Sequence, residues 1–271
     1  SVSRGLWPAL LGEEQAQVLY GLEATAQELV FIVGPAGVAL VAGLASAKVA
    51  IVLSGVLGLG GVIGFVSAPV FAMSARGERQ PRTGLWGSGI APYAAVGICL
   101  TVGFSMTEIA TVAFVGGQHA TTASGIVLAV WSAGSMAGGL LFGAGARQVT
   151  DRALAISVAV AGGGVALAGV APDRVGLAAI LFASGAAIAP SLARLYTRMG
   201  TVAPAGATTE AFGWLSVGFQ VGSSLGAALG GLAVEAINPR WTFALAGAGA
   251  LLGVVAIGVR PRNQSPVASS T

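Results

Sequence analysis

The chain has 271 residues, of which only 13 are Lys or Arg and 10 are Asp or Glu. A soluble chain of this length carries about 68 charged residues. Hydrophobic residues make up 55% of the chain and the mean hydropathy is +0.86, so the polar side chains are too few to cover a water-soluble globule. The composition therefore excludes a soluble enzyme and predicts an all-α, polytopic membrane protein.

Residues that hold metals or covalent cofactors are scarce. Cys99 is the single cysteine and His119 the single histidine, so the sequence offers no internal disulfide and no zinc or haem constellation. The net charge is only +3 without a basic run, which argues against nucleic acid binding. There is no Gly-rich phosphate loop and no Ser nucleophile elbow. We expect no metal, no cofactor and no enzymatic activity.

Eight segments are long and apolar enough to cross a bilayer, whose core of about 30 Å needs about 20 apolar residues per helix. Short breaks rich in Pro, Gly or charge separate them. The predicted spans are Tyr20–Leu44, Ala47–Met73, Gly89–Phe114, Ser124–Gly145, Ala153–Val170, Val175–Tyr196, Ala211–Ala236 and Trp241–Val259.

The spans divide the chain into four regions. We expect a cytoplasmic lead-in and two helices over residues 1–73, a central cytoplasmic loop over 74–88, six helices over 89–259 and a disordered cytoplasmic tail over 260–271. Ten basic residues fall on one side of these spans, and only Lys48, Arg174 and Arg240 fall on the other. Because positive loops stay in the cytoplasm, both termini of this chain are predicted to be cytoplasmic, and the chain to lie in the cytoplasmic (inner) membrane.

Glycines recur at four-residue spacing, which lets helix backbones approach closely in a membrane. The longest series is Gly218, Gly222, Gly226 and Gly230, and Gly134 and Gly138 form a shorter one. A packing surface is favoured over direct contact with a solute. Transporters need such surfaces for sliding and rocking, so these glycines are candidates for gating.

Glu108 is the clearest candidate for chemistry, because an ionisable side chain inside a bilayer is costly. It lies about 18 residues into the third predicted span, roughly 27 Å along its axis. Two interpretations stay open: a carboxylate that carries a proton or pairs with a solute, and one that reaches the outer headgroups. Thr111 lies three residues further and can share its face.

Two other polar side chains lie within predicted spans. Gln220 lies midway along the seventh span, where its amide either lines a cavity or joins helices. Trp131 in the fourth span offers a stacking face for a ligand, although packing is its commoner role.

Several stretches together resemble the bacterial permeases of the major facilitator superfamily. The segment Val33-Gly34-Pro35-Ala36-Gly37 resembles the Gly-Pro-x-x-Gly-Gly antiporter motif of that family's fifth helix, with Val38 and Ala39 where the final glycines stand. Met106-Thr107-Glu108 followed by residues 125–139 is similar to its seventh and eighth helices. Residues 147–152 resemble the charged loop after the eighth helix, with acid and base out of their usual order.

The resemblance covers nearly the whole chain and implies part of the major facilitator fold, from the fifth to the twelfth helix. We then expect the first four helices to be absent, although a closed cavity would need them or a second copy. The implied function is a secondary transporter of a small organic solute, with efflux of a hydrophobic or cationic compound driven by protons. The alternatives are an uptake permease for a sugar or metabolite, and a non-transporting scaffold or sensor on the same fold.

Overall fold

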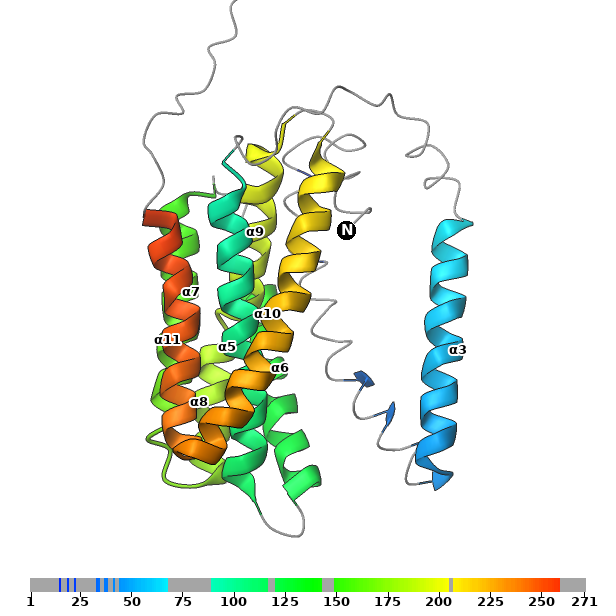
Figure 1. The fold of residues 1–271 in the computed structure, drawn as a ribbon, viewed down its shortest axis with the longest axis vertical. Coiled ribbons are helices and arrows are strands. Elements are labelled where there is room, and N and C mark those ends of the chain that lie inside the picture. Colours follow the sequence, from blue (N-terminus) through cyan, green and yellow to red (C-terminus); the bar gives the residue numbers. More distant parts are fainter. Residues whose placement is uncertain are drawn as a thin grey trace, which may run out of the picture.

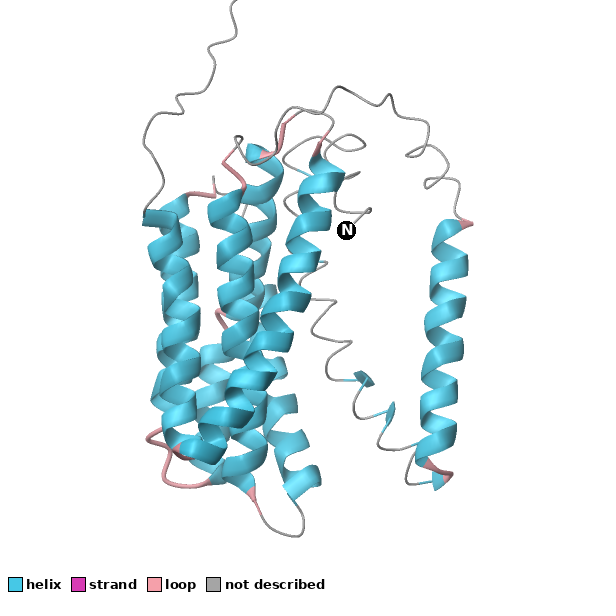
Figure 2. Ribbon diagram, in the orientation of Figure 1, coloured by secondary structure: helices cyan, strands magenta, loops and turns pink. Residues whose placement is uncertain are grey.

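The computed structural model describes residues 44–67, 89–116, 120–142, 149–204 and 207–258, together with isolated positions between residues 15 and 41. Within these ranges the chain is helical, with short loops and no strand (Figure 2). Six helices are long and apolar enough to cross a membrane. This part of the chain is therefore all-α, as predicted, and is a polytopic membrane protein by the length and composition of its helices.

The six candidate spans form one bundle (Figure 1). They are α5 (Ala91–Val115), α6 (Ala120–Phe142), α7 (Asp151–Ala168), the pair α8 (Arg174–Gly185) and α9 (Ile188–Val202), α10 (Thr208–Ala236) and α11 (Pro239–Gly258). These elements match the last six predicted spans to within a few residues, apart from longer ends at α6 and α9. The first predicted span, residues 20–44, lies outside the described residues except for isolated positions.

Helix α5 is the centre of the bundle, since it contacts α6, α7, α9, α10 and α11. Its largest buried side chains include Tyr93 and Leu100. The helix begins after Ile90 with a proline in its first turn, where the missing N–H costs nothing. It ends at Gly116, whose φ of 50° suits glycine and whose N–H donates to the Val112 carbonyl.

Helix α3 (Ala47–Val66) stands apart from the six-helix bundle (Figure 1). Nearly all its described side chains are exposed, among them Ile51 at 72% and Leu57 at 68%. Such a helix, apolar on every face, is typical of one surrounded by lipid or by other helices. It begins where the second predicted span begins, and residues 68–73 of that span lie outside the described residues, as do the predicted central loop 74–88 and the tail 260–271.

The sixth predicted span is interrupted, which the sequence analysis did not anticipate. A turn at Ala186 and Ala187 separates α8 from α9. Pro190 explains the break, because a proline in a continuous helix would clash with the carbonyl four residues earlier, that of Ala186. On α6, Gly138 leaves room for that carbonyl, since a Cβ at Gly138 would overlap it.

Candidate functional site

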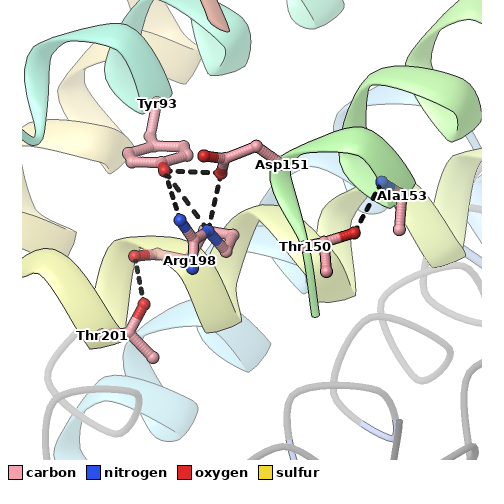
Figure 3. Close-up of polar contacts among 6 residues, drawn as sticks. All are labelled: Tyr93, Thr150, Asp151, Ala153, Arg198 and Thr201. Carbon is pink, nitrogen blue, oxygen red and sulfur yellow. Dashed lines mark hydrogen bonds and ion pairs between the residues drawn. The ribbon is translucent and has the colours of Figure 1, made fainter. Parts of the chain in front are cut away.

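Tyr93, Asp151 and Arg198 form a charged cluster at one end of the bundle (Figure 3). The Tyr93 hydroxyl donates to Asp151 Oδ1 at 2.7 Å, and Arg198 Nε donates to the same oxygen at 2.7 Å. Arg198 Nη2 also donates to the Tyr93 hydroxyl at 3.0 Å. The Arg198 guanidinium lies over the Tyr93 ring, 5.7 Å from its centroid. The cluster therefore joins α5, α7 and α9 through one carboxylate oxygen.

The local sequence fixes each member of the charged cluster near a helix end. Asp151 is the first residue of α7, whose cap is Thr150, the side chain of which accepts from the Ala153 N–H at 3.1 Å. Its carboxylate thus lies at the positive end of the α7 dipole. Arg198 lies one turn before the end of α9. The α7 dipole and the ion pair with Arg198 therefore both stabilise the Asp151 carboxylate.

The charged cluster was not predicted as a unit. Asp151 was expected in the charged loop over residues 147–152, and Arg198 is one of the ten basic residues on the predicted cytoplasmic side, but nothing in the sequence singled out Tyr93. The sequence did carry a signal for this pair. The chain has only 10 acidic residues, and Asp151 stands at the start of a span on the same predicted side as Arg198, so a pairing of the two could have been expected.

Glu108 is exposed on α5. Phe104, one turn earlier on α5, faces α6, since its ring lies edge-on to that of Trp131 with the centroids 5.6 Å apart. Ser105, three residues before Glu108, faces α10, since its hydroxyl lies 2.8 Å from that of Ser223. The carboxylate therefore lies on the surface between α6 and α10. Glu108 is seven residues from the end of α5, or about 10 Å along the axis, so it lies within the candidate span and not at its end.

Thr111 does not share this surface. Its side chain is fully buried, and its hydroxyl donates to the Thr107 carbonyl at 2.8 Å within the same helix. Gln220 is exposed on α10 but lies at another depth. Gly230 contacts α5 at Met106 and Ile109, and Gln220 precedes Gly230 by ten residues, about 15 Å along the axis. The structure therefore does not bring Glu108, Thr111 and Gln220 together.

Trp131 lies beside the α8–α9 break. A Cβ on Gly185 would be 3.1 Å from Trp131 Cδ1, the ring carbon bonded to Nε1. The side chain is 5% exposed, and its Nε1–H has no hydrogen-bond partner among the described residues. One turn along α6, the Ser135 hydroxyl accepts from the Ala189 N–H at 3.1 Å and so satisfies a donor at the start of α9. Two hydrogen-bond donors therefore lie beside the break, midway along the bundle: the Trp131 Nε1–H and the Ala189 N–H, which Ser135 satisfies.

Five of the candidate glycines lie where helices approach closely. Gly218, Gly222 and Gly226 face successive turns of α5, and Gly134 and Gly138 face the carbonyls of Phe182 and Ala186 at the end of α8. Gly34 makes no such contact, since it is exposed and no atom lies within 4 Å of where its Cβ would be, and Pro35 lies outside the described residues. Among the residues that the structure describes, no group of three or more His, Cys, Asp or Glu could hold a metal ion.

Comparison of the chain with protein-family models and with curated proteins found no match.

Proposed function

We propose that this chain is the larger part of a secondary transporter of the major facilitator type, which moves a small organic solute by proton-coupled efflux. The observation that carries the proposal is Glu108, a carboxylate exposed on the surface between α6 and α10 within the candidate span and not at its end. A carboxylate within a membrane span is costly, and such carboxylates mark ion or substrate pathways.

The interrupted span supports the same proposal. Transporter binding sites are typically built at discontinuous helices near the middle of the membrane. The break at Ala186 and Ala187 lies midway along the candidate span Arg174–Val202, beside the buried Nε1–H of Trp131. A hydrogen-bond donor there can bind an acceptor on a solute, while the apolar surroundings favour a hydrophobic molecule. The apolar surroundings and the Glu108 carboxylate, as counter-ion or proton acceptor, fit efflux of a hydrophobic or cationic compound better than uptake of a sugar.

The charged cluster supports a transporter that changes shape. It joins the ends of α5, α7 and α9 on one side of the bundle. Opening of the bundle on that side has to break these bonds or move the three helices together. Close glycine contacts between α5 and α10 are suited to such rigid-body movement.

Glu108→Gln tests the proposal in proteoliposomes with an imposed pH gradient and a clamped membrane potential. We expect the wild-type chain to drive the flux of hydrophobic cations such as tetraphenylphosphonium. The Gln side chain cannot exchange a proton, so the gradient-driven rate should fall at least about tenfold, a loss typical of removing a proton-transfer group. Glu235→Gln, which removes an exposed carboxylate from α10, is the matched control and should keep the rate.

Two results would contradict this proposal. An unchanged rate in Glu108→Gln would remove Glu108 from the coupling mechanism. Absence of gradient-driven flux for a panel of hydrophobic cations in the wild-type chain would favour a non-transporting scaffold or sensor.

A further inference from the structure

Two arginines, Arg174 and Arg240, lie at the end of the bundle opposite the charged cluster. Arg174 Nη2 donates to the Val115 carbonyl at 2.8 Å, and Arg240 Nη1 donates to the Ala171 carbonyl at 2.7 Å. Each cation thus binds carbonyls at the end of a neighbouring helix, α5 or α7, where the dipole is negative. These bonds stabilise Arg174 and Arg240, two of the three basic residues on the predicted outer side.

A cavity of about 630 Å³ opens between these arginines. It is lined by the end of α5 and by the loops before α8 and α11, including Phe114, Asp173 and Asn238. The Arg240 guanidinium lies over the Phe114 ring at 5.1 Å from its centroid, which fixes its plane beside the cavity.

The cavity is electropositive. A guanidinium has five N–H donors, and the bonds to helix carbonyls use only Nη2 of Arg174 and Nη1 of Arg240. The remaining donors, Nε included, have no partner among the described residues. The N-termini of α8 and α11, the positive ends of their dipoles, also open here. Asp173 also lines the cavity and accepts from the Gly176 N–H at 2.8 Å. Its one negative charge is outweighed by the two positive charges of Arg174 and Arg240, so the lining keeps a net positive charge.

Exposed apolar side chains accompany the two arginines. Val175 lines the cavity and is 77% exposed, and Trp241, the residue after Arg240 on α11, is 63% exposed. Trp at a span end is typical of the membrane–water interface. Two arginines beside exposed apolar side chains suit a phosphate attached to acyl chains better than a free anion, because acyl chains would cover those side chains.

We propose that this cavity binds the phosphate of a phospholipid headgroup in the leaflet that faces the ends of α5 and α7. Arg174 and Arg240 bind the phosphate oxygens from two sides, the Asn238 amide lies beside them, and the acyl chains run along Val175 and Trp241. The lipid thereby joins the three segments that meet at this end of the bundle. The assignment is independent of any transport activity.

Native mass spectrometry of the detergent-purified full chain tests this site. Phosphatidylglycerol, diacylglycerol and inorganic phosphate are added in turn to the wild-type chain, to Arg174→Gln/Arg240→Gln and to Arg152→Gln. Arg152 is an exposed cation at the opposite end and is the matched control. We expect phosphatidylglycerol to bind the wild-type and control chains, and to bind the double variant about 25-fold more weakly, roughly fivefold for each arginine.

Diacylglycerol, which lacks the phosphate, should bind weakly to every chain. Equal retention of phosphatidylglycerol by the double variant and the wild-type chain would overturn the site. Inorganic phosphate that binds as tightly as phosphatidylglycerol would overturn the lipid assignment. Because Arg174 and Arg240 also bind helix carbonyls, Arg174→Lys/Arg240→Lys is measured too. These cations preserve the charge and should restore most of the lipid binding.

Discussion

Gly222→Ala is expected to destabilise the bundle by about 2 kcal/mol, a value typical of adding a methyl group to a fully packed interface. Gly222 lies on α10 against α5, and a Cβ there would overlap Thr101 Oγ1 and the Ile98 carbonyl oxygen. The Thr101 side chain can rotate away, but the Ile98 carbonyl belongs to the α5 backbone. The two helices therefore have to separate, which weakens the contacts made by Gly218, Gly226 and Gly230. The measurement is the free energy of reversible unfolding in mixed micelles.

Gly231→Ala on the same helix is the matched control. Gly231 is exposed, and nothing lies within 4 Å of a Cβ built there. Because alanine is the better helix former, this change should be neutral or stabilise the bundle by up to about 1 kcal/mol. Equal effects of the two substitutions would show that α10 does not pack on α5 through its glycine face.

Asp151→Asn should destabilise the chain by roughly 1–3 kcal/mol, the usual cost of leaving a buried hydrogen-bonding group without its partner. The substitution removes the charge that Arg198 and the Tyr93 hydroxyl share, and it leaves a half-buried guanidinium without its anion. The side chains of Arg198 and Asp151 are 22% and 33% exposed, so the solvent screens part of the interaction. The loss should therefore be smaller than that of a fully buried pair.

A double-mutant cycle separates this interaction from other effects of the substitution. Asp151→Asn and Arg198→Gln should be less than additive, with a coupling free energy of about 1 kcal/mol or more. Arg152→Gln, in the same turn of α7 but exposed, should change stability by less than about 0.5 kcal/mol. Strictly additive effects of Asp151 and Arg198 would contradict a direct bond between them.

Hydrophobic length was enough to predict most of the fold. The described bundle places α5, α7 and α11 within a few residues of Gly89–Phe114, Ala153–Val170 and Trp241–Val259. This agreement has a physical cause, since the backbone N–H and C=O groups of a lipid-embedded segment have to be hydrogen-bonded within it and most of its side chains have to be apolar. Helix ends therefore follow the polar breaks in the sequence.

The contacts between spans could not be predicted in the same way. The break between α8 and α9 follows from Pro190, which is visible in the sequence. The space for the Ala186 carbonyl, however, is provided by Gly138 of α6, and that contact cannot be derived from the sequence. The charged cluster likewise joins residues that are 47 to 105 positions apart in the sequence. The glycine spacing predicted which helix faces allow close packing, but it did not identify the helix that packs on each face. The burial of Thr111 likewise depends on the central position of α5, which the sequence does not show.

Side-specific labelling of two introduced cysteines tests most directly whether residues 91–258 cross a membrane as described. The cysteines are introduced in a Cys99→Ser background. Arg152→Cys lies at the end of the bundle that holds the charged cluster, Pro172→Cys lies at the opposite end beside the cavity of Arg174 and Arg240, and both positions are exposed. An impermeant maleimide should label Pro172→Cys in intact cells and Arg152→Cys only after permeabilisation, since positive loops are cytoplasmic. Labelling of both from the same side, or release of the chain from membranes by alkaline carbonate, would contradict a bundle that spans the bilayer.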